Sequence, residues 1–344
     1  MNTVMIHTEN PYPVVIGSGA LHLLGQYITA DQVCVISDSH VWPIYGQAIC
    51  QILDQSHIRH IHFVFPAGEN SKNITTYCEI LNFLAENHMT RSSQLIALGG
   101  GVVGDLTGFV AATYLRGISY IQVPTTLLAM VDSSVGGKTG IDLPAGKNLC
   151  GAFHQPKAVL CDTDTLATLP REIFRDGCAE VIKYGILYDA TLFAHLEETG
   201  FGFAREWVIR RCIEHKGQTV QQDTLDRGAR KFLNFGHTVG HALEQQSDYA
   251  LSHGKAVAIG MALMCKAVKI PDTHRILSLL EQLQLPVSTE VTAADIYAAA
   301  LSDKKRSGDT IDLILPERIG KCQLSTLPLE TFQTLIKEGL SYGY

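Results

Sequence analysis

The first half of the chain alternates short apolar runs with amphipathic stretches. Glycine, proline or an acid ends most of the apolar runs, and the stretches between them carry apolar residues at helical spacing, as at Ile74, Ile80 and Leu84. Such alternation predicts an open, mostly parallel α/β sheet of a Rossmann-like but non-standard kind. Strands are expected at 3–7, 12–16, 33–38, 60–65, 94–98, 119–123 and 158–161, and helices at 21–28, 41–55, 73–88 and 102–115.

The pattern becomes helical from about residue 169. Helices are expected at 172–198, 203–222, 229–246, 253–268, 273–283, 293–301 and 329–338, with a short β segment at 310–315. The change of pattern predicts two domains, an α/β domain over 1–168 and a mostly α-helical domain over 169–344.

Composition narrows the class of protein. The 344 residues are 46% hydrophobic and 18% charged, as in a globular protein, and the net charge of -7 argues against a nucleic-acid partner. No apolar run approaches the roughly 20 residues that a membrane span needs, and the N-terminus lacks a signal pattern. The nine cysteines form no C-x-x-C pair, so reduced thiols in a cytoplasmic protein are expected.

Three histidines suggest a metal site. His237 and His241 are four residues apart, which places them on one face of a helix, and His253 begins the next apolar run. Neutral imidazoles at such spacing commonly hold a zinc-like ion. The alternative is that these are capping or core-edge histidines.

A glycine-rich turn suggests a dinucleotide site. The run from Gly99 to Gly104 satisfies G-x-G-x-x-G between an expected strand and an expected helix, whose N-terminus could face a pyrophosphate. A tight turn without a ligand is the alternative. The strand at 119–123 lacks the usual ribose-binding acid, so Asp38 and Glu69, after two earlier strands, are expected to replace it, with Lys72 nearby. These features predict a nicotinamide cofactor in a non-standard layout.

The segment after this turn is dense in polar and cationic residues. The run 123–140, together with Gly99 to Asp105 and Ala145 to Leu149, closely resembles the 3-dehydroquinate synthase family of sugar-phosphate cyclases. The resemblance extends from Asp38 to Lys305. It implies a fold shared with glycerol-dehydrogenase-like enzymes.

The resemblance changes the expected metal site. It places the family's metal ligands on Glu180, His237 and His253, and makes His241 a substrate-side residue. Glutamate with two histidines and an open position is typical of catalytic zinc, and cobalt accepts the same ligands.

The resemblance also implies the remaining site residues. The implied catalytic residues are Lys183, His241, Asn148 and Asp132. The implied NAD contacts are Asp38, Glu69, Lys72, Gly101, Val102, Val103, Gly104, Asp105, Thr125, Thr126, Lys138, Lys147, Thr165, Leu166, Ala167 and Thr168. The implied substrate contacts are Asp132, Lys138, Asn148, Lys183, Lys216, Arg230, Asn234, His241, His253, Lys304, Lys305 and Arg116. Arg116 resembles the arginine that reaches the neighbouring subunit's site, which implies a homodimer.

The family's reaction would explain the many lysine and arginine residues, because its substrate is anionic. It converts 3-deoxy-D-arabino-heptulosonate 7-phosphate, an anionic sugar phosphate, to 3-dehydroquinate and phosphate. It proceeds by transient NAD-dependent oxidation, phosphate elimination, re-reduction, ring opening and aldol closure. Arginine and lysine groups would bind the carboxylate and phosphate. Three alternatives stay open: another cyclase of the family, a metal-dependent polyol dehydrogenase of the related fold, and an inactive nucleotide- or metal-binding regulator.

Overall fold

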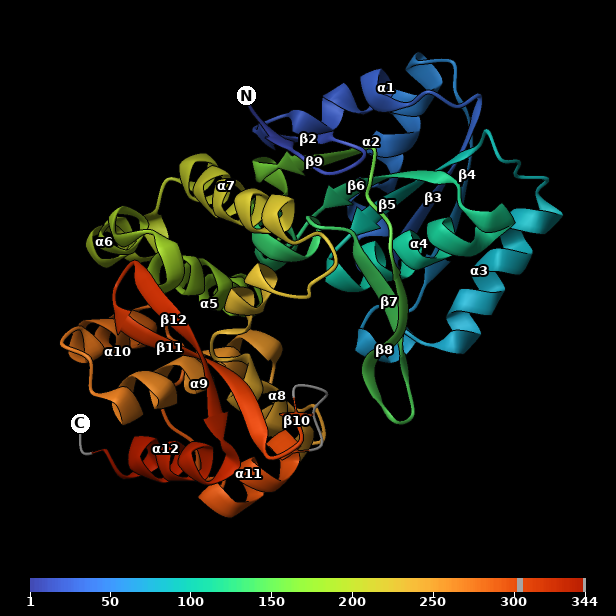
Figure 1. Ribbon diagram of the computed structural model, residues 1–344. Helices are drawn as coiled ribbons and strands as arrows, with labels where there is room; N and C mark the ends of the chain where they lie inside the picture. The colour runs from blue at the N-terminus through green and yellow to red at the C-terminus, as the bar shows by residue number, and fades with distance from the viewer. Residues whose placement is uncertain (302–305, 343–344) are drawn as a thin grey trace. The chain divides into compact units, whose positions relative to one another are not determined.

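The computed structural model describes residues 1–301 and 306–342, and the chain forms two compact units (Figure 1). The α/β unit comprises Met1–Pro170 and Arg205–Leu225, and the helical unit comprises Arg171–Ala204 and Asp226–Tyr344. The chain first passes from the α/β unit to the helical unit after Pro170, close to the boundary expected at residue 168. The helix expected at 203–222, however, belongs to the α/β unit, so one boundary does not describe the chain.

The α/β unit contains the expected sheet. Its seven strands have the order β1-β2-β9-β6-β5-β3-β4, and every neighbouring pair is parallel except β1 with β2. The mostly parallel sheet is therefore confirmed. Its strands are β1 (Asn2–Ile6), β2 (Tyr12–Gly17), β3 (Gln32–Asp38), β4 (Arg59–Phe65), β5 (Gln94–Gly99), β6 (Ser119–Pro124) and β9 (Ala158–Asp162).

Helices cover both faces of this sheet (Figure 1). Alternate side chains of β3 show why, because Cys34 and Ile36 pack into one core with α3 and α4, while Val33 and Val35 pack into another with α1 and α2. The helical elements of this part are η1 (Ala20–Leu23), α1 (Leu24–Tyr27), α2 (Trp42–Gln55), η2 (Glu69–Ser71), α3 (Ile74–Glu86), α4 (Gly101–Thr113), η3 (Tyr114–Arg116) and η5 (Thr163–Ala167).

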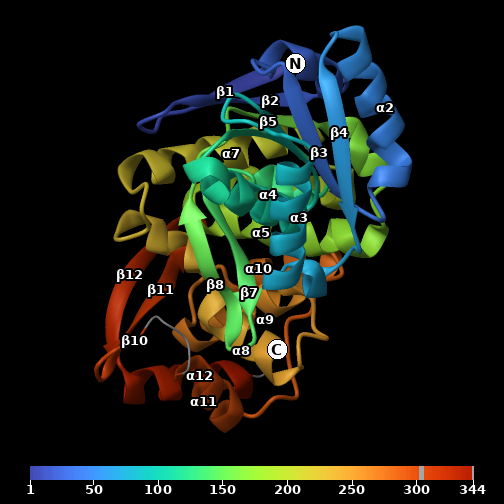
Figure 2. The same cartoon turned by 90° about the vertical axis from the view of Figure 1, so that its right-hand side faces the viewer.

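The polar segment after β6 folds in a way that the sequence pattern did not predict. A π-helical turn, η4 (Ala129–Ser133), precedes a two-stranded antiparallel hairpin of β7 (Lys138–Leu143) and β8 (Gly146–Phe153) (Figure 2). Gly140 and Gly151 face each other across it, and a Cβ at Gly151 would lie 2.1 Å from the Thr139 carbonyl oxygen. Glycines and cations replace the alternating apolar pattern by which a strand is usually recognised.

The returning helix α7 (Arg205–Gln222) packs on the α/β unit. Glu206 accepts hydrogen bonds from Asn2 Nδ2 and Ser18 N at its N-terminal end. Further along, Gly217 lies so close to Ile6 that a Cβ would be 2.9 Å from its Cδ1. These contacts explain why α7 leaves the helical unit.

The helical unit is built around α9 (His253–Val268), which is buried on nearly every side. Two helices expected as continuous are broken. Asp189 ends the first and caps the next helix by accepting from Thr191 N and Leu192 N, and Gly236, with φ 78°, breaks the second. The other helices are α5 (Arg171–Tyr188), α6 (Ala190–Thr199), η6 (Gly200–Gly202), η7 (Ala229–Asn234), α8 (His237–Gln246), α10 (Thr273–Gln282), α11 (Ala293–Leu301) and α12 (Leu329–Ser341).

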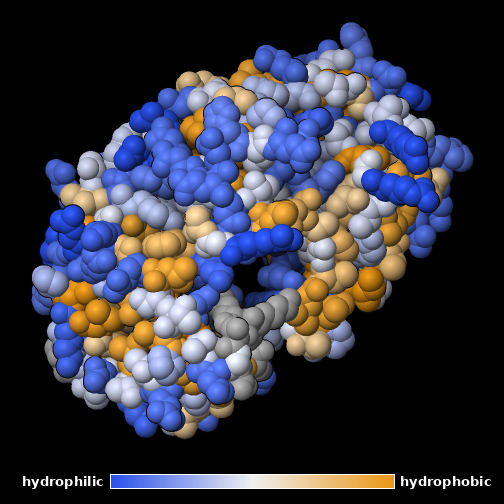
Figure 3. All heavy atoms as spheres, viewed as in Figure 1, coloured by the Kyte–Doolittle hydropathy of each residue, from blue (hydrophilic) through white to orange (hydrophobic). Residues whose placement is uncertain are grey.

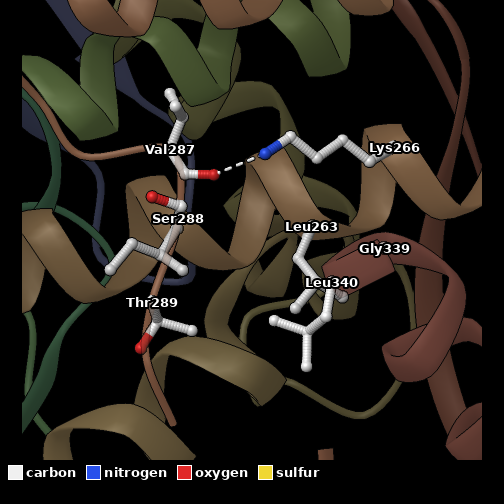
Figure 4. Close-up of a pocket in the computed structure, with 8 residues that line it drawn as sticks. Leu263, Lys266, Val287, Ser288, Thr289, Gly339 and Leu340 are labelled. Atoms are coloured by element: carbon white, nitrogen blue, oxygen red, sulfur yellow. Dashed lines mark hydrogen bonds between the residues drawn. The ribbon is translucent and has the colours of Figure 1, made fainter. Parts of the chain in front are cut away.

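A small antiparallel sheet and a small cavity complete the helical unit. The sheet joins β10 (Arg306–Ser307), β11 (Thr310–Arg318) and β12 (Lys321–Pro328), although the sequence predicted only the start of β11. Most side chains of β12 are exposed or half-buried, so its apolar signal is weak. The cavity, about 40 Å³, lies among Leu263, Lys266, Val287 and Leu340, with room for water but not for a sugar phosphate (Figure 4).

The molecular surface in the view of Figure 3 is mixed, with apolar residues in patches among hydrophilic ones. Among the described residues, no helix combines the length and apolar character needed to cross a membrane.

Candidate functional site

Three side chains from separate helices of the helical unit meet at one point. Glu180 lies in the middle of α5, His237 is the first residue of α8, and His253 is the first residue of α9. The Nε2 atoms of both histidines lie 3.4 Å from Glu180 Oε1. The structure therefore brings together the three residues that the family resemblance named as metal ligands.

Glycines allow these helices to come so close. A Cβ at Gly260 of α9 would lie 2.0 Å from the Gly236 carbonyl oxygen before α8, and one at Gly254 would lie 2.0 Å from the Asp176 carbonyl oxygen of α5. Both distances are far below van der Waals contact, so only glycine fits. The glycines beside the histidines thus set the spacing of the ligand-bearing helices.

The charges around Glu180 keep it ionised although it is buried. Burial favours the neutral acid, but the Lys183 ammonium, with which it forms a buried ion pair, and His237 hold the pKa of Glu180 well below its usual value. Burial, and then the Lys183 charge, lowers the pKa of His237 to about 3. His237 Nδ1 lies 3.0 Å from the Phe235 carbonyl oxygen, the acceptor that a neutral Nδ1–H requires, which leaves Nε2 free to face Glu180.

The donor set fits a small divalent cation. Zinc bonds of about 2.0–2.2 Å in a tetrahedron place two ligand atoms roughly 3.3–3.6 Å apart. The two measured separations from Glu180 Oε1, both 3.4 Å, match that edge. Among the described residues, neither oxygen of Glu180 makes a hydrogen bond of good geometry, although both are buried. A cation held by Glu180, His237 and His253 would add a second positive partner, beside Lys183, for this buried carboxylate.

The glycine-rich turn in the α/β unit has the geometry expected of an anion-binding turn. β5 ends at Gly99, α4 begins at Gly101, and Gly99 O accepts from Thr125 N at 3.0 Å. A Cβ at Gly100 would lie 3.0 Å from Thr126 Cγ2, which explains the absence of a side chain there. The first N–H groups of α4 are thereby available to a phosphate.

Lys72 organises the other cofactor residues in the same unit. Its buried ammonium donates to Asp105 Oδ2 and to Asn148 Oδ1, both at 2.6 Å, and lies 3.9 Å from Glu69 Oε1. Burial lowers the pKa of Lys72, but Asp105 and Glu69 outweigh it and raise the pKa. The side chain of Asn148, expected to act on substrate, therefore lies with residues expected to contact the cofactor.

Lys216 and Asp132 form a second pair in the α/β unit. Lys216 Nζ lies 3.0 Å from Asp132 Oδ1 and also donates to the Asp132 backbone carbonyl. Lys216 is buried in α7, and Asp132 belongs to the π-helical turn η4. This contact also holds α7 against the α/β unit, and it gives the buried Lys216 a counter-charge.

The other expected site residues have varied surroundings. Asp38 Oδ1 accepts from His40 N and Val41 N before α2, while Lys138 and Arg116 are exposed, Lys147 is half-buried and Arg230 is buried. Gly101, Val102, Val103 and Gly104 form the first turn of α4. Thr165, Leu166, Ala167 and Thr168 lie in or after η5, and Asn234 ends η7. Lys304 and Lys305 lie outside the described residues.

Comparison with known proteins decides the family. The family model of the 3-dehydroquinate synthase N-terminal region matches residues 62–176, and that of the C-terminal region matches residues 177–306. The chain belongs to the 3-dehydroquinate synthase family. It is 43% identical to the 3-dehydroquinate synthase of Pseudoalteromonas translucida over 92% of this chain and 93% of that one. It is 40% identical to the enzyme of Streptococcus suis over 94% and 96%.

The fold of the 3-dehydroquinate synthase family also occurs in related cyclases. The structure resembles that of 2-epi-5-epi-valiolone synthase from Streptomyces hygroscopicus, solved with NAD⁺ and Zn²⁺, with a TM-score of 0.89 and 28% identity over 98% of each chain. The sequence predicted an open α/β sheet followed by a helical part. The solved cyclase structure has this fold.

Glu244, which sequence reasoning missed, lies beside the candidate metal ligands. It is buried on α8, and its Oε2 lies 3.6 Å from His253 Nδ1, so the two ring nitrogens of His253 face two different carboxylates. Burial lowers the pKa of His253, but Glu180 and Glu244 together raise it to about 10. The signal was the spacing, because Glu244 follows His237 by seven residues and His241 by three, on one helix face.

Replacing Glu244 with glutamine is expected to lower zinc affinity about tenfold, because outer carboxylates orient a ligand histidine and raise its basicity. The measurement is competition for Zn²⁺ with a chromophoric chelator. Glu197→Gln, which removes a carboxylate that pairs with Arg275 instead, is the control and should bind zinc normally. Equal affinities of the two variants would contradict this role for Glu244.

Proposed function

We propose that this protein converts 3-deoxy-D-arabino-heptulosonate 7-phosphate to 3-dehydroquinate and inorganic phosphate, with NAD⁺ and one divalent metal, zinc or cobalt, as cofactors. The observation that carries the proposal is the meeting of Glu180, His237 and His253 beside the buried Lys183. Membership of the 3-dehydroquinate synthase family identifies the reaction. A relative of the same fold that binds NAD⁺ and Zn²⁺ supports both cofactors.

Each cofactor has a set of residues suited to hold it. Glu180, His237 and His253 would hold the metal, and the turn from Gly101 to Asp105 would hold the NAD pyrophosphate, with Asp38 and Glu69 toward the ribose. When bound, NAD⁺ supplies a hydride acceptor that returns the hydride later, and the metal supplies positive charge that acidifies a substrate hydroxyl. We expect no net consumption of NAD⁺.

The protein's own residues bind, orient and exchange protons. We assign Lys183 and His241 to positioning the substrate hydroxyls and moving protons on them, with Asp132 and Asn148 in supporting catalytic roles. The cations Lys138, Lys216 and Arg230 would bind substrate anions, with Asn234 as a polar contact and Lys304 or Lys305 adding a further charge. Their positive charges would pair with the carboxylate and the phosphate of the substrate.

A homodimer forms part of the proposal, because Arg116 resembles an arginine that reaches the neighbouring subunit. Arg116 is exposed, and it adopts φ 70° directly after Leu115 at φ 51°. Two consecutive left-handed residues are costly and fix the direction of this loop. Sedimentation velocity would test the dimer, and Arg116→Ala should then lower activity without changing metal content.

The decisive assay follows phosphate and NADH together. Purified protein with NAD⁺ and the heptulosonate phosphate should release phosphate without net NADH, and a chelator should stop the release. Steady formation of NADH from a polyol would indicate a dehydrogenase instead. Release of phosphate only from a different sugar phosphate would favour another cyclase, such as one related to 2-epi-5-epi-valiolone synthase.

A further inference from the structure

The helix that begins with His253 has an unusual start. Its N-cap is Ser252, and its first residues, His253, Gly254 and Lys255, contain no acid. In the capping box, a serine N-cap is followed by glutamate or glutamine at the third helical position, which here is Lys255. A lysine there also opposes the helix dipole. The first turn of α9 therefore lacks a stabilising acid of its own.

Asp176 of α5 provides that acid from a neighbouring helix. Its Oδ1 accepts from the Ser252 hydroxyl and, at 3.2 Å, from Lys255 N. The backbone of Gly254 rests directly against the Asp176 carbonyl, where a Cβ would lie 2.0 Å from the oxygen. The side chain and main chain of Asp176 thus contact Ser252, Gly254 and Lys255 at the start of α9.

The position of Asp176 relates this cap to the metal group. Asp176 and Glu180 are four residues apart on α5, so they lie on one face about 6 Å apart along the axis. The cap and the metal ligand His253 likewise share the first turn of α9. Two adjacent helices are therefore joined one helical turn away from the point where each supplies a ligand.

We propose that Asp176 is a positioning residue that caps α9 in place of a local glutamate and so keeps His253 in register with Glu180. The inference rests on the proposed metal site, since register matters there only if both residues bind one ion. Ligand positions must hold to within about 0.2 Å for tight metal binding, whereas an uncapped helix end frays.

The test compares zinc affinity and stability in five proteins. Asp176→Ala is expected to weaken Zn²⁺ binding about 10–100-fold, the usual effect of losing an outer contact of a metal site. Asp176→Asn keeps an acceptor oxygen and should retain most of the affinity. Adding Lys255→Glu to Asp176→Ala creates the sequence Ser-x-x-Glu and should recover much of the loss. Asp189→Ala removes the corresponding buried cap of α6, and should lower the thermal midpoint of the metal-free protein without changing zinc affinity.

Three outcomes overturn the proposal: unchanged zinc affinity in Asp176→Ala, equal loss in Asp189→Ala, or no recovery in the double variant although it folds. Affinity is measured by chelator competition, and the absorption spectrum of the Co²⁺ form reports whether the ligand geometry has changed. If Asp176→Ala does not fold, Asp176→Asn and the double variant still decide. Failure of the wild-type protein to bind zinc would instead refute the proposed metal site, so the two failures are distinguishable.

Discussion

A Glu180→Gln variant is expected to retain no bound metal after purification and to release phosphate at no more than about a thousandth of the wild-type rate, equivalent to a loss of about 4 kcal/mol in the transition state. Both histidine Nε2 atoms lie 3.4 Å from the same Glu180 oxygen, so the loss of this ligand affects its spacing to both histidines. The neutral amide keeps the shape of the side chain but removes its charge.

The same substitution also removes the counter-charge of Lys183. Lys183 is 1% exposed and pairs with Glu180, so the variant leaves an ammonium buried beside a neutral amide. Breaking such a pair typically costs about 3–5 kcal/mol of stability unless the lysine gives up its proton. Metal content by elemental analysis, phosphate release and denaturant unfolding measure the three effects. Glu172→Gln, exposed in the first turn of the same helix, should change none of them. Stoichiometric zinc in Glu180→Gln would refute the metal assignment.

Much of the fold follows from periodicity. The alternation of apolar runs with amphipathic stretches predicted the parallel sheet. In β3, Val33 and Val35 face one core and Cys34 and Ile36 the other, as a continuous apolar strand covered on both sides requires. The β7–β8 hairpin was missed because glycine and lysine fill positions where apolar residues usually mark a strand. The break at Asp189 was missed because a capping side chain interrupts a helix without changing the apolar stripe on either side.

The candidate metal ligands Glu180, His237 and His253 show that sequence spacing alone does not identify a metal site. The pair His237 and His241 is adjacent on α8, with ring centroids 5.5 Å apart, as the four-residue spacing requires. Spacing alone suggested that both bind the metal. The structure brings Glu180 of α5 to His237 and His253, and it brings His241 to Glu244 and His253. Only the packing of α5 against α9, set by glycine contacts, determines that arrangement. Asp176 was missed for the same reason, because its contacts with Ser252 and Lys255 join two helices that are far apart in the sequence.

The structure changes the interpretation of the cationic residues most. From the sequence, their number indicated binding of an anionic substrate. Two of the lysines expected to contact substrate are nevertheless buried against carboxylates, Lys183 on Glu180 and Lys216 on Asp132. Lys72, expected to contact the cofactor, is likewise buried against Asp105. A buried ammonium needs such a partner in the folded protein whether or not substrate is present. The number of basic residues therefore overstates the positive charge that can bind the substrate, because neighbouring carboxylates already balance part of it.

Gly254→Ala is expected to be among the most damaging glycine-to-alanine substitutions in the helical unit. Its Cβ would lie 2.0 Å from the Asp176 carbonyl oxygen, about 1 Å inside the closest approach that real structures show, so the first turn of α9 must move. A shift of that size exceeds the tolerance of a metal site several-fold, because ligand distances must be correct to about 0.2 Å. Zinc affinity is expected to fall at least about a thousandfold, and phosphate release with it.

Gly202→Ala is the matched control for this prediction. Gly202 is exposed at the end of η6 in the same unit, and a Cβ there meets nothing within 4 Å. The control should bind zinc and release phosphate as the wild type does, with stability equal or slightly higher because alanine restricts the unfolded chain. If Gly254→Ala matched Gly202→Ala in zinc affinity, α5 and α9 would not need to pack this closely to form the site. Loss of zinc in Gly254→Ala alone, with both proteins folded by circular dichroism, would show that backbone contact between the helices sets the ligand geometry.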